Sequence, residues 1–195
     1  MDRRDFLKTV AVSGAAMTIQ RSEAMEILTQ AVNSTGKPDL VAVMGDEPEL
    51  MFQRAIAELG GMKQFVKSGQ KVVVKPNIGW DKVPELAGNT NPKLVAEIVK
   101  QCFAAGAKEV TVFDHTCDDW QKCYKNSGIE SAAKAAGAKV MPAHLESYYR
   151  PVDLSKGKNM KKAKIHEAIL NCDVWINVPI LKNHGGANLT IAMKN

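Results

Sequence analysis

Short apolar runs, typical of buried strands, alternate along the chain with longer segments in which apolar residues recur every three or four positions, typical of helices. The clearest run is at residues 72–74, where three consecutive valines are flanked by polar residues. Such a run is typical of a strand buried on both faces. Pro76 cannot donate a hydrogen bond to a sheet, so we expect this strand to end near Lys75. A second apolar run, at residues 174–181, is likewise followed by lysine, asparagine and histidine.

The same pattern predicts the remaining elements of an α/β fold. We expect further strands at residues 40–44, 108–113 and 139–141, and helices at residues 48–59, 92–105 and 124–137. Alternating strands and helices favour a mostly parallel sheet flanked by helices, with right-handed crossovers. Residues 148–170 alternate apolar and polar positions around a lysine-rich turn, which predicts a small β-hairpin excursion. The sequence has no Gly-x-Gly-x-x-Gly motif or Walker loop, so a dinucleotide-binding Rossmann domain is not supported.

The amino terminus has the features of a twin-arginine export signal. Arg3 and Arg4 precede Phe-Leu-Lys at residues 6–8. The weakly apolar residues 9–19 are too few, and too rich in small side chains, to span a bilayer stably. Small residues before Ala24 suit signal peptidase, so we expect cleavage there and a periplasmic protein. The alternative is an amphipathic first helix with two chance arginines.

These features divide the chain into three parts. We expect a signal peptide at residues 1–24, a polar linker at 25–38 and a single α/β domain at 39–195. The sequence stops at Asn195 without a helix cap or a polar tail. We therefore expect the domain to continue beyond that residue.

Composition and charge are those of a soluble globular protein and do not indicate a nucleic-acid partner. The hydrophobic fraction is 45% and the formal net charge is only +5. Much of this charge comes from the lysines between Lys156 and Lys164, among which aromatic residues hardly occur. A stacking platform for bases is therefore not expected, and the segment is interpreted as a solvated basic loop.

The cysteine pattern encodes no metal centre of a usual type. The four cysteines, Cys102, Cys117, Cys123 and Cys172, form no Cys-x-x-Cys pair. Iron–sulfur clusters and structural zinc sites are therefore not encoded by their usual spacings. In an oxidising compartment Cys117 and Cys123 could form a disulfide, and two free thiols fit the sequence equally well. The cofactor stays open, and an iron–sulfur cluster would belong to a partner or to a segment outside this sequence.

Candidate chemistry gathers where the predicted strands end. In a parallel sheet the carboxyl ends of the strands share one edge, and ligands bind there. Lysines at this edge can hold a carboxylate or a phosphate, and a glycine pair before a helix start would add backbone N–H donors. The expected catalytic residues are Lys75, Lys182, His184 and Asp114, and the expected substrate-binding residues are Asn77, Asn183, Gly185, Gly186 and His115.

Other interpretations of these residues remain open. Asp114 with His115 or His184 could instead bind a metal or act as acid–base groups. Each residue also has an ordinary structural explanation: a lysine after a strand is commonly solvated, Asp114 could cap a turn, and a single histidine is commonly structural. His144, after the fourth strand, is interpreted as a loop residue.

Several of these segments carry a family resemblance. The matching stretches are residues 72–77, 89–95, 107–114, 177–184 and 189–195. In this order they resemble the uncharacterised family called domain of unknown function 362, some members of which carry ferredoxin-type iron–sulfur modules. The ferredoxin cysteines of those members are absent here. The resemblance implies no established reaction, and it implies that the family pattern continues beyond residue 195.

Two functional hypotheses follow. The first is an exported enzyme that acts on a small anionic metabolite in association with an iron–sulfur redox partner. The second is a non-catalytic module that binds an anion or scaffolds a redox complex. A remote alternative is an enzyme similar to nickel-dependent lactate racemases, which also bind anionic substrates with lysines and histidines. Under the first hypothesis, Lys75→Ala or Lys182→Ala should abolish turnover and leave the thermal midpoint nearly unchanged.

Overall fold

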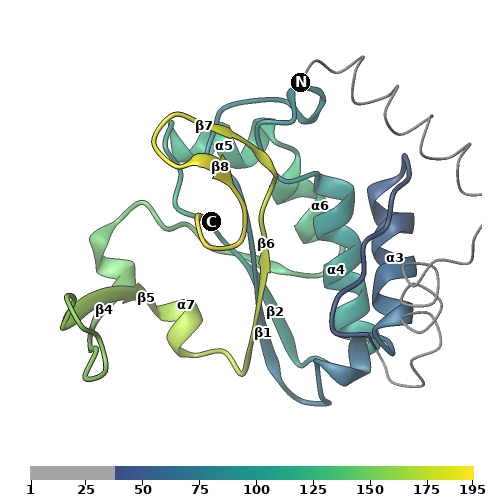
Figure 1. Ribbon diagram of the computed structural model, residues 1–195, viewed down its shortest axis with the longest axis horizontal. Coiled ribbons are helices and arrows are strands. Elements are labelled where there is room, and N and C mark those ends of the chain that lie inside the picture. The colour runs from purple at the N-terminus through teal and green to yellow at the C-terminus, as the bar shows by residue number, and fades with distance from the viewer. Residues whose placement is uncertain (1–37) are drawn as a thin grey trace, which may run out of the picture. The chain divides into compact units, whose positions relative to one another are not determined.

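The computed structural model describes residues 38–195, which form an α/β unit around a four-stranded parallel sheet (Figure 1). The strand order is β3-β2-β1-β6. The strands are β1 (Lys71–Pro76), β2 (Glu109–Val112), β3 (Lys139–Val140) and β6 (Val174–Val178). This arrangement confirms the predicted α/β fold. The expected signal peptide and nearly all of the expected linker lie outside the described residues.

The valine strand is at the centre of the sheet, as its composition predicted. β1 pairs in parallel with β2 on one side and with β6 on the other. Val72, Val73 and Val74 are all at most 2% exposed, because both faces of β1 are covered. Val72 and Val74 point into the main core, whereas Val73 points to the opposite face.

Helices cover the main-core face of the sheet (Figure 1). They are α3 (Pro48–Glu58), α4 (Pro92–Ala104) and α6 (Ile129–Ala135), with α5 (Trp120–Asn126) preceding α6. α4 begins as predicted: Asn91 caps it by accepting a hydrogen bond from the backbone N–H of Lys93 (2.9 Å), and Pro92 occupies its first turn. The apolar stripe of α4 then packs against β1 and β2.

The single helix expected at residues 124–137 is wrong, because this segment forms part of α5 and then α6. Gly128 separates the two helices and has a φ of 71°, in the left-handed region. Glycine adopts this conformation at little cost and commonly terminates helices through it. The alanine-rich composition predicted helix correctly but did not reveal the break.

The strand expected at residues 40–44 is also wrong. Residues 38–47 contain neither helix nor strand, and Leu40 and Met44 are 84% and 97% exposed. An apolar run becomes a strand only where a neighbouring strand accepts its backbone hydrogen bonds. No strand of the sheet within residues 38–195 pairs with this segment.

The opposite face of the sheet carries a smaller layer. It comprises the antiparallel hairpin of β4 (Tyr149–Asp153) and β5 (Lys162–His166), followed by the one-turn helix α7 (Glu167–Leu170). Val73, Phe113, Ala143 and Ala168 form the core between this layer and the sheet. The hairpin confirms the predicted β excursion.

The chain then adds a second hairpin, β7 (Lys182–His184) and β8 (Asn188–Thr190), beyond β6. The helix start expected after Gly185 and Gly186 is wrong, since these residues form the turn of this hairpin. Three short 3-10 turns complete the described structure: η1 (Met62–Gln64), η2 (Pro84–Leu86) and η3 (Glu146–Tyr148). Among the described helices, none has the length and apolar character needed to cross a membrane.

Candidate functional site

A cavity of about 180 Å³ lies at the carboxyl edge of the sheet. It is bounded by the loops after β1 and β2, by β7 and β8, and by the end of the described chain. Six of the nine residues expected at the site line it: Lys75, Asn77, Asp114, His115, Lys182 and His184. Asn183, Gly185 and Gly186 do not line it. The prediction that strand ends distant in sequence meet here is therefore borne out by the geometry.

Lys75 and Asp114 form a buried ion pair at the ends of β1 and β2. Lys75 Nζ lies 2.5 Å from Asp114 Oδ1, and their side chains are 16% and 5% exposed. The other carboxylate oxygen, Oδ2, accepts a hydrogen bond from the backbone N–H of Ile78 (2.7 Å). Asp114 thus compensates the charge of Lys75 and fixes the loop that follows β1.

Lys182 is held differently, by neutral groups. Its Nζ donates to Asn77 Oδ1 (3.1 Å) and to the carbonyl oxygen of Gly88. Within the described part of the chain, no carboxylate lies within 4.0 Å of this ammonium group. Burial lowers the pKa of Lys182 below its ordinary value of 10.5; the charge of Lys194 acts in the same direction, whereas Cys117 and Asp114 oppose the shift. The ring of Trp80, 5.8 Å from Nζ, forms a flat wall beside it.

The ring of His184 is oriented by the turn between β7 and β8. Its Nδ1 accepts hydrogen bonds from the backbone N–H groups of Gly186 (3.1 Å) and Ala187 (3.0 Å). A neutral histidine that accepts at Nδ1 carries its proton at Nε2, so the assigned hydrogen bonds make Nε2–H a donor. The expected role of the Gly186 N–H as an anion donor is not supported, because this group already binds His184.

An asparagine network closes one side of the cavity. Asn195 Nδ2 donates to the carbonyl oxygen of Lys75 (3.1 Å) and to Asn177 Oδ1 (2.8 Å). Its Oδ1 accepts from Asn77 Nδ2 (3.3 Å), so Asn77 is held by Asn195 on one side and by Lys182 on the other. Thr90 Oγ1 accepts from the Asn77 backbone N–H and donates to the Val178 carbonyl, 2.8 Å in each case. These contacts join the ends of β1 and β6.

The sequence interpretation missed several residues that line the cavity: Gly79, Trp80, Cys117, Thr190, Lys194 and Asn195. Lys194 and Asn195 lie in one of the stretches that carry the family resemblance, and that was the only signal for them. His144, by contrast, lies outside the cavity and stacks on Trp120, with ring centroids 4.5 Å apart.

The thiols and the acidic groups do not form a metal centre in the described region. Cys117 and Cys123 are both free, so the structure contains no disulfide between them. Burial raises the pKa of Cys123 to about 11, which keeps this thiol protonated at neutral pH. No group of three or more histidine, cysteine, aspartate or glutamate side chains among residues 38–195 is arranged to hold a metal ion.

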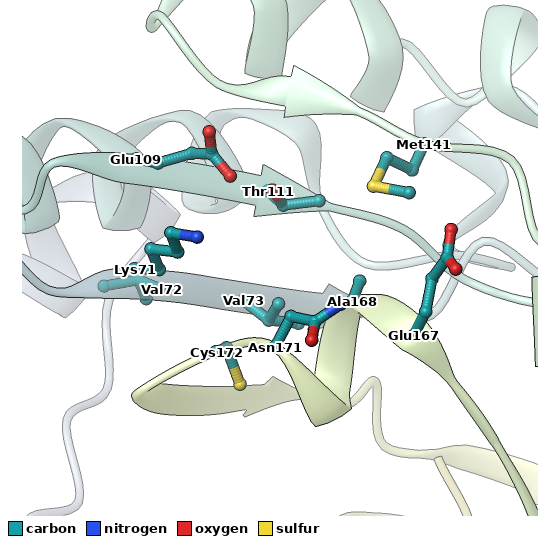
Figure 2. A pocket seen from close by; sticks show the side chains of 10 residues that line it. All are labelled: Lys71, Val72, Val73, Glu109, Thr111, Met141, Glu167, Ala168, Asn171 and Cys172. Carbon is teal, nitrogen blue, oxygen red and sulfur yellow. The ribbon is translucent and has the colours of Figure 1, made fainter. Parts of the chain in front are cut away.

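A second cavity, of about 300 Å³, lies on the sheet face that α7 covers only partly (Figure 2). Its floor is formed by Val73, Thr111 and Met141. The two carboxylates at its rim, Glu109 and Glu167, are already paired with Lys139 and Arg150. This cavity is larger than the one at the carboxyl edge, but its carboxylates are already paired, and burial raises the pKa of the Cys172 thiol that lines it. The carboxyl edge is therefore the better candidate site.

Comparison with known proteins shows the family to which the chain belongs. A family model described as a domain of unknown function (DUF362) matches residues 72–195, which include the whole candidate site. The chain belongs to this family. The DUF362 chain is also 26% identical, over 137 residues, to a thylakoid-associated protein of Synechocystis sp.. That alignment covers 70% of this chain and 41% of the relative, so the chain spans less than half the length of this relative. No solved structure matches the chain.

Proposed function

We propose that the cavity at the carboxyl edge binds a small anionic metabolite and that the DUF362 chain belongs to an enzyme acting on it. The observation that carries this proposal is the environment of Lys182. Its ammonium group lines the cavity, is bound by neutral acceptors only and lies near a second cation, Lys194. The charge of Lys75, by contrast, is compensated by Asp114. Lys75, Lys182 and Lys194 are positive and Asp114 is negative, so the cavity lining has a net charge of +2 when its histidines are neutral.

The chemistry of the lining suits a carboxylate or a phosphate. An anion beside Lys182 would receive a charge-assisted hydrogen bond, and His184 Nε2–H is suited to donate a second one. A volume of about 180 Å³ corresponds to roughly six water molecules at about 30 Å³ each, which suits a small metabolite. His115 and Cys117 also line the cavity and are the groups left to move a proton or to attack a bound carbonyl.

The second candidate is a module that binds the anion without transforming it. Lys182 supports both candidates equally, and only His115 and Cys117 favour catalysis. Export to the periplasm, an iron–sulfur redox partner and the remote lactate-racemase-like alternative rest on the sequence alone.

The test has two stages. Small mono- and dianions such as lactate, oxalate and inorganic phosphate are first screened for stabilisation of the protein against heat, since a ligand of the folded state raises the midpoint by mass action. Each ligand found is then incubated with wild-type protein and with His115→Ala. Consumption by the wild type that the variant loses supports the enzyme. Binding without consumption supports the module, and stabilisation by none of the anions contradicts both.

A further inference from the structure

The hairpin of β4 and β5, residues 149–166, carries an unusual share of the charge of the protein. It contains six basic residues and a single acidic one, Asp153, which gives it a formal net charge of +5. The whole chain also has a net charge of +5, so the remaining residues hold twenty basic and twenty acidic side chains and are neutral together. We call residues 149–166 the basic hairpin.

Most of these charges are uncompensated. Arg150 pairs with Glu167, and Lys164 pairs with Glu146. The other four basic residues of the hairpin are Lys156, Lys158, Lys161 and Lys162. All four are exposed, and none lies within 4.0 Å of a carboxylate of residues 38–195. These four exposed lysines therefore create a concentrated positive potential at the end of the hairpin.

The hairpin also presents an apolar side chain at its tip. Met160 is 61% exposed and lies between Lys158 and Lys161 in sequence. The turn is held by its own backbone: the Leu154 N–H donates to the Lys161 carbonyl (2.8 Å), and the Gly157 N–H donates to the Leu154 carbonyl (2.9 Å). Figure 1 shows the hairpin projecting from the sheet, away from α3, α4 and α6 and from the β7–β8 hairpin beside the cavity. A flat partner can therefore reach its tip.

We propose that the basic hairpin docks the protein on the surface of an anionic lipid bilayer, with its four unpaired lysines over the headgroups and Met160 inserted between them. Clusters of four or more basic residues are attracted to anionic lipid, and each contributes about 1 kcal/mol. Transfer of the exposed Met160 side chain from water to the headgroup–acyl boundary is favourable because it buries apolar surface. This binding is peripheral and needs no membrane-spanning segment.

Lipid fits this surface better than nucleic acid does. Residues 154–164 contain no aromatic side chain on which a base could stack and no arginine that could bind a phosphate or a guanine with two hydrogen bonds. Lysines are point charges that suit a fluid, laterally mobile array of anionic headgroups.

The test is co-sedimentation of the full chain with phosphatidylcholine vesicles, with and without phosphatidylglycerol. We expect binding only to the vesicles that contain phosphatidylglycerol. That binding should weaken as the salt concentration rises through about 0.1 M, where charges are screened over about 10 Å. Replacement of Lys156, Lys158, Lys161 and Lys162 by serine should reduce the partition coefficient about fivefold per lysine. Met160→Ser should weaken binding at every salt concentration.

A matched control removes the same charge elsewhere. Lys100, Lys108, Lys122 and Lys125 are exposed and likewise have no carboxylate within 4.0 Å among residues 38–195. Their replacement by serine should leave vesicle binding nearly unchanged, with the thermal midpoint of each variant recorded to show that it folds. Equal losses in both quadruple variants would overturn the proposal, as would equal binding to both kinds of vesicle. Tighter binding of a DNA or RNA oligonucleotide than of anionic vesicles would also overturn it.

Discussion

At the residue scale, Lys75 and Lys182 follow similar apolar runs in the sequence but have different surroundings: Lys75 lies within β1, whereas Lys182 begins β7. Lys75 is paired with a buried carboxylate, whereas Lys182 is held by an amide and a carbonyl. Both lysines were expected to have the same role, because the pairing of Lys75 with Asp114 depends on β1 lying beside β2, which could not be predicted. The ion pair favours a stabilising role for Lys75, whereas the neutral contacts of Lys182 support the ligand-binding role that we propose for it.

This difference predicts the effect of Lys75→Ala. The substitution leaves the Asp114 carboxylate buried without its cation, and loss of one partner of a buried pair typically costs about 3–5 kcal/mol. Urea unfolding should show this loss, contrary to the sequence-based expectation of an unchanged thermal midpoint. Lys134→Ala, which breaks the exposed pair with Glu130, should cost less than about 1 kcal/mol. Unchanged stability of Lys75→Ala would show that Asp114 does not depend on this lysine.

Asn77→Asp tests the charge of Lys182 without removing the lysine. The new carboxylate would have nearly the shape of the amide and would lie about 3.1 Å from Lys182 Nζ. It would compensate the ammonium group and repel an incoming anion. The affinity for whichever of phosphate and oxalate binds should therefore fall at least about tenfold, which corresponds to the loss of one charge-assisted hydrogen bond. Gln121→Glu, at an exposed position of α5 away from the cavity, is the matched control for the added charge. If only the control weakens binding, the anion does not sit beside Lys182.

At the element scale, α7 depends on one buried histidine. His166 is 2% exposed; its Nδ1 caps α7 by accepting from the Ala168 N–H (3.1 Å), and its Nε2 lies 3.2 Å from the Pro142 carbonyl. Phe113 stacks on the ring with centroids 4.1 Å apart. Protonation would remove the acceptor at Nδ1, and burial lowers the pKa of His166 below its ordinary value of 6.5 despite the nearby charge of Glu167.

This arrangement predicts that stability falls in acid. Because the folded-state pKa is below the unfolded-state value, the unfolded chain takes up the proton first as the pH drops. The contribution of His166 is therefore fully present above about pH 6.5 and is lost as the pH falls through the folded-state pKa. In urea unfolding between pH 8 and pH 5, His166→Asn, which can still cap α7, should show a shallower pH dependence than the wild type. His144→Asn, an exposed control, should follow the wild type; identical slopes for all three proteins would contradict this role.

Helices and strands were predicted correctly where the local sequence pattern determines the structure. The prediction failed where the structure depends on pairing with another segment of the chain. The strand at residues 71–76 and the start of α4 follow from valine content and from the Asn-Pro cap. Residues 40–44 have the same apolar pattern as a strand but do not pair with the sheet. The break at Gly128 was hidden because glycine is tolerated within helices as well as at their ends.

At the scale of the whole molecule, the parallel sheet explains why the candidate site could be located but not detailed. A parallel arrangement brings all strand ends to one edge, so the residues after 74 and 181 could be placed together from the sequence. The strand order could not be predicted from the sequence. The contact of Asp114 with Lys75 was therefore missed, because it requires β2 to lie beside β1. Asn195 was missed because a polar residue at the end of the sequence has no periodic pattern to interpret. The match to the DUF362 family covers the residues of this site, but the family description does not name a reaction.

The central claim is that Lys182 anchors a small anion at the carboxyl edge of the sheet. Isothermal titration of the full chain with inorganic phosphate and with oxalate tests it most directly. We predict saturable binding of at least one of these anions at one site, weakened about ten- to a hundredfold in Lys182→Ala and unchanged in Lys125→Ala, since a charge-assisted hydrogen bond contributes about 1.5–3 kcal/mol. Equal affinity of wild type and a folded Lys182→Ala variant for both anions would contradict the claim.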